Sequence, residues 1–283
     1  MSDRARRYDH WTEIADRVFT RRYRFYDQQI GAILTAAGPV IVDTRSSAGQ
    51  ARELQADLRE LTDTPVAAVV DTHHHHDHAF GNAIFRPAPI WGHIRCAAEL
   101  VENGEAARAD VIGWHPELAD DLRATEIVPP DRTFDQATTV EVGGRRLELS
   151  HPGRGHTADD IVVLVPDVGV LFAGDLVENG APPFFGDGYP LDWPETLRVL
   201  RDLVSGVVVP GHGDVDDVTL VDRTISDTEA IARLAREVAA GSLDLEAACA
   251  AAPYPPAAAR EPIERGVAQV RGELDPDAAL DPR

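Results

Sequence analysis

Lysine is absent from the sequence, and all 27 basic residues are arginine. A lysine nucleophile, a Schiff-base lysine and a lysine clamp for an anionic substrate are therefore excluded. Cysteine is almost absent too, because Cys96 and Cys249 are the only two and provide no disulfide framework. Such cysteine use is typical of a reducing compartment, so we expect a cytoplasmic protein.

No apolar run approaches the roughly 20 residues that a membrane-spanning helix needs. No apolar stretch follows the arginines of residues 1–8 either, so a signal peptide is not expected. The formal net charge is -21, which argues against nucleic acid and against an anionic membrane, because both need a basic face. The expected partner is a small-molecule substrate, and no pattern indicates an oligomeric state.

The chain has 283 residues, enough for one sizeable α/β domain or two small ones. We expect residues 1–20 to be a polar lead-in, 21–215 the main domain, and 216–283 a helical extension packed on that domain. Apolar spacing predicts helices, and β-branched runs predict strands, over the following ranges: helices 47–61, 94–103, 195–203 and 219–240; strands 66–70, 161–165, 168–173 and 207–209. Residues 104–126 are polar and mixed, and we interpret them as an insertion.

Five histidines and an aspartate lie within residues 73–78, directly after the apolar run 66–70. An affinity tag would sit at a terminus beside a linker, so a metal site is the better interpretation. On an extended or turning loop the alternate side chains His73 and His75 can reach one ion. Asp77 and His78 then lie on a neighbouring face, where they can serve a second ion.

Three further ligand candidates follow later apolar runs, each beside glycine: His156, Asp175 and His212. Glycine at these places permits tight loops and a close approach of the backbone. Nitrogen and oxygen ligands of this kind suit zinc first, with iron or manganese as alternatives.

The order of these motifs carries a family resemblance: His73-x-His75-x-Asp77-His78, then His156, then Gly174-Asp175, then Pro210-Gly211-His212-Gly213. Together they resemble the signature of the metallo-β-lactamase superfamily, and Asp43 matches the aspartate of the family's first motif. The resemblance spans residues 20–215. Within the family, Phe172-Ala173-Gly174-Asp175 followed by Phe184-Phe185-Gly186 is similar to the glyoxalase II-like branch of hydrolases.

The resemblance implies a four-layer αββα sandwich with two metal ions, expected to be zinc, at one edge between its sheets. His73, His75 and His156 would hold the first ion, Asp77, His78 and His212 the second, and Asp175 would bridge both. His74 and His76 would then be spacers that point away. Such a centre implies hydrolysis of a small ester, lactone, thioester or amide by a metal-bound hydroxide, with Asp77 as the catalytic carboxylate.

Two further groups of residues are candidates around this centre. The first group would orient the ligand imidazoles, although turn and cap chemistry explains its members equally well: Asp43, Thr72, His151 and Thr157. The second group would line a substrate pocket: Arg154, Asn179, Phe184, Phe185 and Tyr189. Arg154 either binds a substrate carboxylate or is a solvated loop arginine, and the aromatic residues either line the pocket or pack beneath it.

The resemblance leaves several activities open. It does not favour β-lactams as the main substrate, because Asp175 stands where the commonest zinc β-lactamases have cysteine, and their substrate-binding lysine is absent. Quorum-signal lactonases have a tyrosine three residues after the bridging aspartate, where this sequence has Glu178. A persulfide dioxygenase with one iron on the first-site residues is an alternative of the same fold, and a non-catalytic family member is another.

Overall fold

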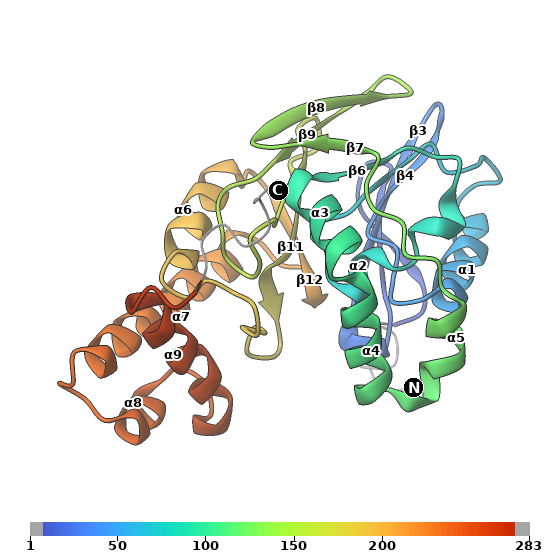
Figure 1. Cartoon of the computed structure of the whole chain (residues 1–283). Helices are drawn as coiled ribbons and strands as arrows, with labels where there is room; N and C mark the ends of the chain where they lie inside the picture. Colours follow the sequence, from blue (N-terminus) through green and yellow to red (C-terminus); the bar gives the residue numbers. More distant parts are fainter. Residues whose placement is uncertain (1–7, 275–283) are drawn as a thin grey trace, which may run out of the picture.

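Two β-sheets lie face to face between two groups of helices in the computed structural model, which describes residues 8–274 (Figure 1). Apolar side chains from both sheets fill the space between them, among them Val40, Val70, Leu147 and Phe172. Removing this apolar surface from water is the main force that holds the two sheets together. The expected four-layer αββα sandwich is confirmed.

Within residues 8–274 the first sheet has seven strands in the order β1-β2-β3-β4-β5-β6-β7. Their bounds are β1 (Trp11–Ala15), β2 (Val18–Arg22), β3 (Gln29–Thr35), β4 (Gly38–Val42), β5 (Ala68–Val70), β6 (Ile90–His93) and β7 (Arg132–Phe134). Neighbours from β1 to β4 are antiparallel, whereas neighbours from β4 to β7 are parallel. Parallel neighbours need long crossover connections, and helices provide them here.

The first half of the chain forms helices and short 3-10 turns with the following bounds: α1 (Ala48–Asp57), α2 (His76–Ala79), α3 (Ile94–Glu102), α4 (Gly104–Trp114), α5 (Ala119–Ala124), η2 (Phe25–Asp27), η3 (Leu58–Glu60), η4 (Asn82–Phe85) and η5 (Pro116–Leu118). The side chain of Ser47 begins α1 by accepting a hydrogen bond from the backbone N–H of Gln50. Residues 104–126, interpreted as an insertion, form α4, η5 and α5, and α4 contacts α2.

Over residues 11–20 the predicted polar lead-in forms strands, and Trp11 and Val18, its candidates for packing on the domain edge, lie in them. These residues belong to β1 and β2 and extend the first sheet at one edge. The physical reason is burial, because Val18 is fully buried and the Trp11 indole donates to the carbonyl of Asp57 at 2.9 Å. Residues 1–7 of the lead-in and 275–283 of the C-terminal extension lie outside the described residues.

The second sheet has the order β12-β11-β10-β9-β8. Its strands are β8 (Ala137–Val142), β9 (Arg145–Ser150), β10 (Val162–Val165), β11 (Val170–Asn179) and β12 (Val207–Gly213). The hairpin of β8 and β9 turns at Gly143 and Gly144, whose positive φ angles of 53° and 81° suit glycine. β11 and β12 run parallel, and α6 (Trp193–Leu203) lies between them in the chain.

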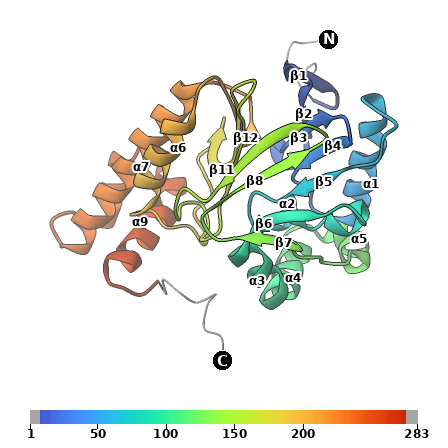
Figure 2. The same cartoon turned by 90° about the horizontal axis from the view of Figure 1, so that it is seen from above.

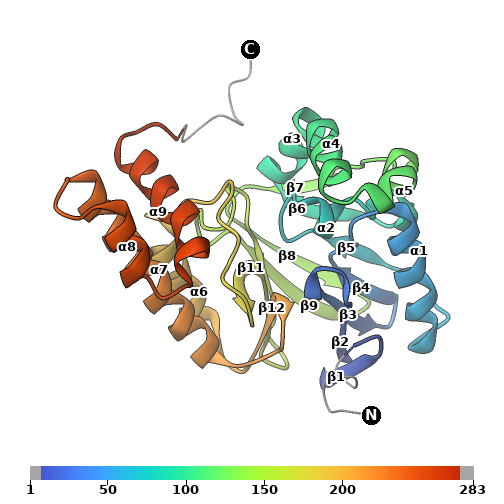
Figure 3. The same cartoon turned by 90° about the horizontal axis from the view of Figure 1, so that it is seen from below.

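Three more helices follow the second sheet: α7 (Val218–Ala239), α8 (Leu245–Ala251) and α9 (Pro256–Val270). Figures 2 and 3 show α6 to α9 on one side of the sandwich and α1, α3, α4 and α5 on the other. Leu220 and Ile263 share a buried cluster with Leu176 of β11, so these helices pack on the sheet rather than beside it. Among the described residues, no helix combines the length and the apolar character that a membrane crossing needs.

Candidate metal centre

The predicted ligands meet at one edge of the sandwich. The loop after β5 carries the histidines from His73, Asp175 lies within β11, and His212 lies within β12. Because β11 and β12 are parallel, their carboxyl ends lie at the same edge, and Figure 1 shows both arrowheads at the lower side of the sandwich. Gly211 allows the close approach, since a Cβ there would lie only 1.8 Å from Asp175 Oδ1.

The first group of donor atoms comes from His73, His75, His156 and Asp175, whose ligand atoms lie within 4.8 Å of one another. His156 Nε2 is 2.8 Å from His75 Nδ1 and 3.4 Å from Asp175 Oδ2. His73 Nε2 is 3.8 Å from the same carboxylate oxygen. Ligand atoms about 2.1 Å from a tetrahedral zinc ion lie about 3.4 Å apart, so one ion fits among these donors.

The second group comes from Asp77, His78 and His212. Asp77 Oδ2 is 3.5 Å from His78 Nε2 and 3.4 Å from His212 Nε2. Asp175 also contacts this group, because Oδ1 is 3.3 Å from His78 Nε2 and Oδ2 is 3.1 Å from His212 Nε2. The carboxylate of Asp175 therefore lies between the two groups, where a bridging ligand would lie.

The second nitrogen of each ligand imidazole already has a hydrogen-bond acceptor. Asp43 Oδ2 accepts from His78 Nδ1 at 2.8 Å and from the Thr72 hydroxyl at 3.0 Å. Since this hydroxyl donates to Asp43, it accepts from His73 Nδ1 at 3.0 Å. In the neutral imidazole both contacts place the proton on Nδ1, so Nε2 is the ligand atom and is turned toward the group of ligands.

The other three ligand histidines follow the same pattern with different acceptors. His75 Nε2 lies 3.0 Å from Asp187 Oδ2, which leaves Nδ1 for an ion. His156 Nδ1 lies 3.0 Å from the carbonyl oxygen of Phe184. His212 Nδ1 lies 2.7 Å from the carbonyl oxygen of Tyr26. Each of the five rings is thus oriented through the nitrogen that does not face the centre.

Two buried atoms that could bind a metal ion make no hydrogen bond among the described residues: His73 Nε2 and Asp175 Oδ1. Leaving such atoms unsatisfied is costly unless they serve another purpose. Burial lowers the pKa of His73 well below its usual value and that of His156 to about 4, so both rings are neutral at pH 7. Neutral imidazoles are the protonation state that a divalent metal requires, so His73 and His156 are already in the form that an ion at the first group needs.

The electrostatics of the second group also favour a divalent ion. Burial lowers the pKa of His212, but Asp175 and Asp77 outweigh it and raise that pKa to about 10. Burial acts against ionisation of Asp175, yet His212 and His78 hold its pKa well below the usual range. The two buried carboxylates thus stabilise positive charge at this position, and a divalent ion would supply it.

The predicted orienting residues divide evenly. Asp43 and Thr72 contact ligand imidazoles, as described above. His151 instead lies 2.7 Å from the carbonyl oxygen of Asp160 and stacks on His93. Thr157 donates its hydroxyl within its own loop, at 2.8 Å to Asp160 Oδ1. Neither His151 nor Thr157 has a contact with a ligand imidazole among the described interactions, so the turn chemistry considered for them is what the structure shows.

A cavity of about 840 Å³ opens over the two groups of ligands, which is a size suited to a small molecule. Asn179 and Phe184 line it, as the sequence predicts for pocket residues. Phe185 does not, because it is buried against Trp193, with ring centroids 4.8 Å apart. Arg154 and Tyr189 lie outside the lining too.

Arg154 is held away from the cavity by two neighbours. Its guanidinium donates to Asp192 at 2.6 Å and lies 4.5 Å from the ring centroid of Tyr189. The sequence leaves two alternatives for this arginine, which either binds a substrate carboxylate or is solvated in its loop. The structure instead pairs Arg154 with Asp192.

His74 and His76 belong to neither of the two predicted ligand groups, but they do not point away from the cavity, in contrast to the prediction. Both line the cavity. His74 Nδ1 is held by Asp159 Oδ2 at 2.8 Å, and the ring of His76 lies edge-on to Tyr26 with centroids 5.5 Å apart. The loop 73–78 ends in the short helix α2, so its side chains do not alternate as they would on a strand.

Sequence reasoning also missed three contributors to the site. Asp187 contacts His75, and its place between two glycines in the aromatic segment 184–189 was the available signal. Tyr26 supplies a backbone carbonyl, which no side-chain pattern reveals. Trp114 comes from α4, so the segment interpreted as an insertion forms part of the cavity wall.

The sequence profile of the Metallo-beta-lactamase superfamily matches residues 26–212. A Metallo-beta-lactamase type 2 of Elizabethkingia meningoseptica is 25% identical over 199 residues, which cover 68% of this chain and 72% of that relative. The protein of the same description from Bacillus cereus is 27% identical over 197 residues, covering 68% of this chain and 69% of the relative. Among solved structures, a Metallo-beta-lactamase from Pontibacter korlensis has a TM-score of 0.63 at 28% identity, over 78% of this chain and 98% of that one.

The matched segment contains both groups of ligands, and the family profile covers well over half of the chain. The relatives are hydrolases by their descriptions. Their similarity and the two His/Asp groups together indicate a metal-dependent hydrolase. The chain belongs to the metallo-β-lactamase superfamily.

Proposed function

We propose that this chain is a dinuclear hydrolase that holds two divalent ions, zinc first, and cleaves an ester, lactone, thioester or amide of a small molecule. The observation that carries the proposal is the orientation of the five ligand histidines. Each has one nitrogen hydrogen-bonded to a carboxylate, hydroxyl or carbonyl and the other turned toward Asp77 or Asp175. A complete ligand set for two ions favours hydrolysis over the dioxygenase and over a non-catalytic role.

Two divalent ions would supply the polarisation of a substrate carbonyl and the lowered pKa of a bound water. The protein's own part is to position and to accept protons. Asp77 lines the cavity, and its Oδ2 is directed to His78 and His212. Its Oδ1 is not part of these two contacts and lies 3.7 Å from His76 Nδ1. This second oxygen is therefore the one that can orient the attacking nucleophile and accept its proton.

The proposal extends to partners and location. A cavity of about 840 Å³ admits a small molecule, and the net charge of -21 opposes nucleic acid and anionic membranes, so we expect neither as a partner. Both cysteines are buried and free, which supports the proposed cytoplasmic location. The glyoxalase II-like branch remains a prediction.

A hydrolysis screen with the zinc-loaded protein tests the proposal. The panel contains aryl esters, lactones, thioesters and β-lactams, and we expect turnover with at least one of the first three classes. Asp77→Ala should abolish that turnover, whereas Glu195→Gln, which removes an exposed carboxylate that does not line the cavity over the ligands, should retain it. Equal turnover by Asp77→Ala and the wild type would show that the mechanism is wrong. Uptake of oxygen by an iron-loaded protein, without any hydrolysis, would favour the dioxygenase.

A further inference from the structure

The cavity over the metal centre is acidic beyond its ligands. Among the described residues its lining contains four carboxylates outside the two predicted ligand groups: Asp27, Asp110, Glu178 and Asp187. Asp187 also lies within 4.8 Å of ligand atoms of His74 and His75, a third group that could hold an ion. The same lining contains no arginine, and the sequence has no lysine. A substrate with a carboxylate or sulfate would therefore find no guanidinium or ammonium side chain on this wall.

The four carboxylates differ in how far their charge is compensated. Asp27 is paired with Arg22 at 2.5 Å, and Asp187 is shared between His74 and His75. Asp110 and Glu178 have no ion pair within the described part of the chain. Glu178 accepts only the backbone N–H of Phe184, at 3.0 Å. Asp110 is exposed and thus presents uncompensated negative charge to the cavity. Burial and the neighbouring Asp175 raise the pKa of Glu178 to about 7, so Glu178 is only partly ionised at pH 7.

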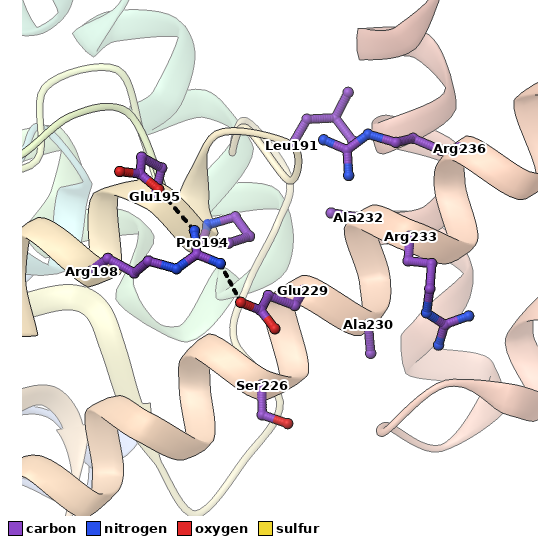
Figure 4. Close-up of a pocket in the computed structure, with 10 residues that line it drawn as sticks. All are labelled: Leu191, Pro194, Glu195, Arg198, Ser226, Glu229, Ala230, Ala232, Arg233 and Arg236. Carbon is purple, nitrogen blue, oxygen red and sulfur yellow. Dashed lines mark hydrogen bonds and ion pairs between the residues drawn. The ribbon is translucent and has the colours of Figure 1, made fainter.

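The arginines near the second sheet are occupied elsewhere. Arg154 is paired with Asp192. A separate cavity of about 500 Å³ lies between α6 and α7, and there Arg198 bridges Glu195 and Glu229 (Figure 4). This second cavity contains none of the metal ligands, so its arginines cannot hold a substrate over the centre.

Aromatic faces complete the wall of the acidic cavity. Trp114 from α4 is 63% exposed and Phe184 from the loop after β11 is 50% exposed, although both line the cavity. Tyr26 lines the same cavity and is fixed by a contact of 2.6 Å between its hydroxyl and His115 Nε2. Open aromatic faces together with uncompensated carboxylates are the surroundings in which proteins bind alkylammonium groups.

We propose that this cavity selects substrates that carry a cationic, alkylammonium-type group next to the bond that is cleaved. The inference rests on the proposed function, since it names the substrate class of the same site. The cation would lie against Trp114 and Tyr26 within the field of Asp110 and Glu178, while the carbonyl would lie over the ligands. Anionic substrates would be disfavoured for the same electrostatic reason.

Three benzoate esters that differ only in the charge of their alcohol part provide the kinetic test. Benzoylcholine is the cationic ester, 3,3-dimethylbutyl benzoate its neutral isostere and 3-sulfopropyl benzoate the anionic member. Each kcat/KM is divided by the rate of alkaline hydrolysis of the same ester, which removes differences in intrinsic reactivity. We expect the cationic ester to exceed its isostere by about tenfold, and the anionic ester to be the poorest.

Two variants assign the preference to the named carboxylates. Asp110→Asn and Glu178→Gln should each lower the ratio of cationic to neutral kcat/KM by about threefold to tenfold. Glu195→Gln removes a carboxylate of the other cavity and should leave the ratio at the wild-type value. A ratio near one in the wild type, or a ratio that neither cavity variant changes, would overturn the proposal.

A binding measurement separates this inference from the proposed function. Benzyltrimethylammonium should quench tryptophan fluorescence saturably, and Trp114→Phe should remove most of that change, whereas benzylsulfonate should leave the fluorescence unchanged. Quenching without hydrolysis of any ester would contradict the proposed function and support the cation site. Hydrolysis of the neutral ester without cation preference or quenching would support the function and refute the cation site.

Discussion

Replacing Asp43 by asparagine tests how the ligand histidines are oriented. The Asp43 carboxylate is buried and accepts three hydrogen bonds, from the backbone N–H of Thr72 at 2.8 Å, from the Thr72 hydroxyl at 3.0 Å, and from His78 Nδ1 at 2.8 Å. Asp43 has a positive φ of 68°, a conformation that asparagine also tolerates. Asp43→Asn therefore keeps the shape of the site and the backbone while changing an acceptor into a donor.

The magnitude follows from these bonds. The single carbonyl oxygen of asparagine can retain the bond from the backbone of Thr72, so its amide NH2 faces the hydroxyl of Thr72 and Nδ1 of His78. His78 then loses a hydrogen bond to a charged acceptor, worth about 1.5–3 kcal/mol, and its proton is favoured on Nε2, the ligand atom. Loss of such an orienting partner weakens metal binding by about 10- to 100-fold, or about 1.4–2.7 kcal/mol.

Zinc affinity measured by chelator competition gives the readout, with circular dichroism to show that the variant is folded. Asp187→Asn provides a matched comparison, because Asp187 orients His75 in the same manner but its side chain is 44% exposed, against 3% for Asp43. We expect zinc affinity to fall by about 100-fold in Asp43→Asn, where the carboxylate is buried, and by about tenfold in Asp187→Asn, where it is partly exposed. Unchanged affinity in a folded Asp43→Asn protein would refute the proposed role of the hydrogen bonds.

Three further predictions concern packing and metal binding. Phe185→Ala should lower the free energy of unfolding by about 3–5 kcal/mol in denaturant titration, because the ring is fully buried, whereas Phe184→Ala should change it by less than about 0.5 kcal/mol; equal losses would contradict the assigned positions. Gly211→Ala should reduce bound zinc below the wild-type content in elemental analysis, since the new Cβ would displace Asp175. Removing metal with EDTA should lower the Tm by about 5–10 °C in calorimetry, and an unchanged Tm would indicate that the ions do not bind the folded state.

The ligand set could be predicted because its members are marked in the sequence by type and by position. His73 to His78 are contiguous, and His156, Asp175 and His212 each follow an apolar run beside glycine. The structure brings these residues together in two groups, and the αββα sandwich agrees with the resemblance. The sequence thus suffices to predict a ligand when its residue type suits a metal and it follows a predicted strand.

What could not be predicted depends on contacts between distant segments. The acceptor for His212 is a backbone carbonyl of Tyr26, 186 residues away in the chain, and every residue has such a carbonyl. Phe184 and Phe185 are adjacent and chemically identical, yet one lines the cavity and the other is buried beneath it. Residues 11–15 form a strand of low burial, so apolar and polar residues do not alternate clearly there and the sequence gives only a weak indication of a strand.

The number of divalent ions on the catalytically active protein tests the central claim most directly. We predict about two zinc ions per chain by elemental analysis, together with hydrolysis of an ester, lactone, thioester or amide that EDTA abolishes and zinc restores. One iron ion per chain with uptake of oxygen would contradict the account, as would hydrolysis that persists in protein shown to hold no metal.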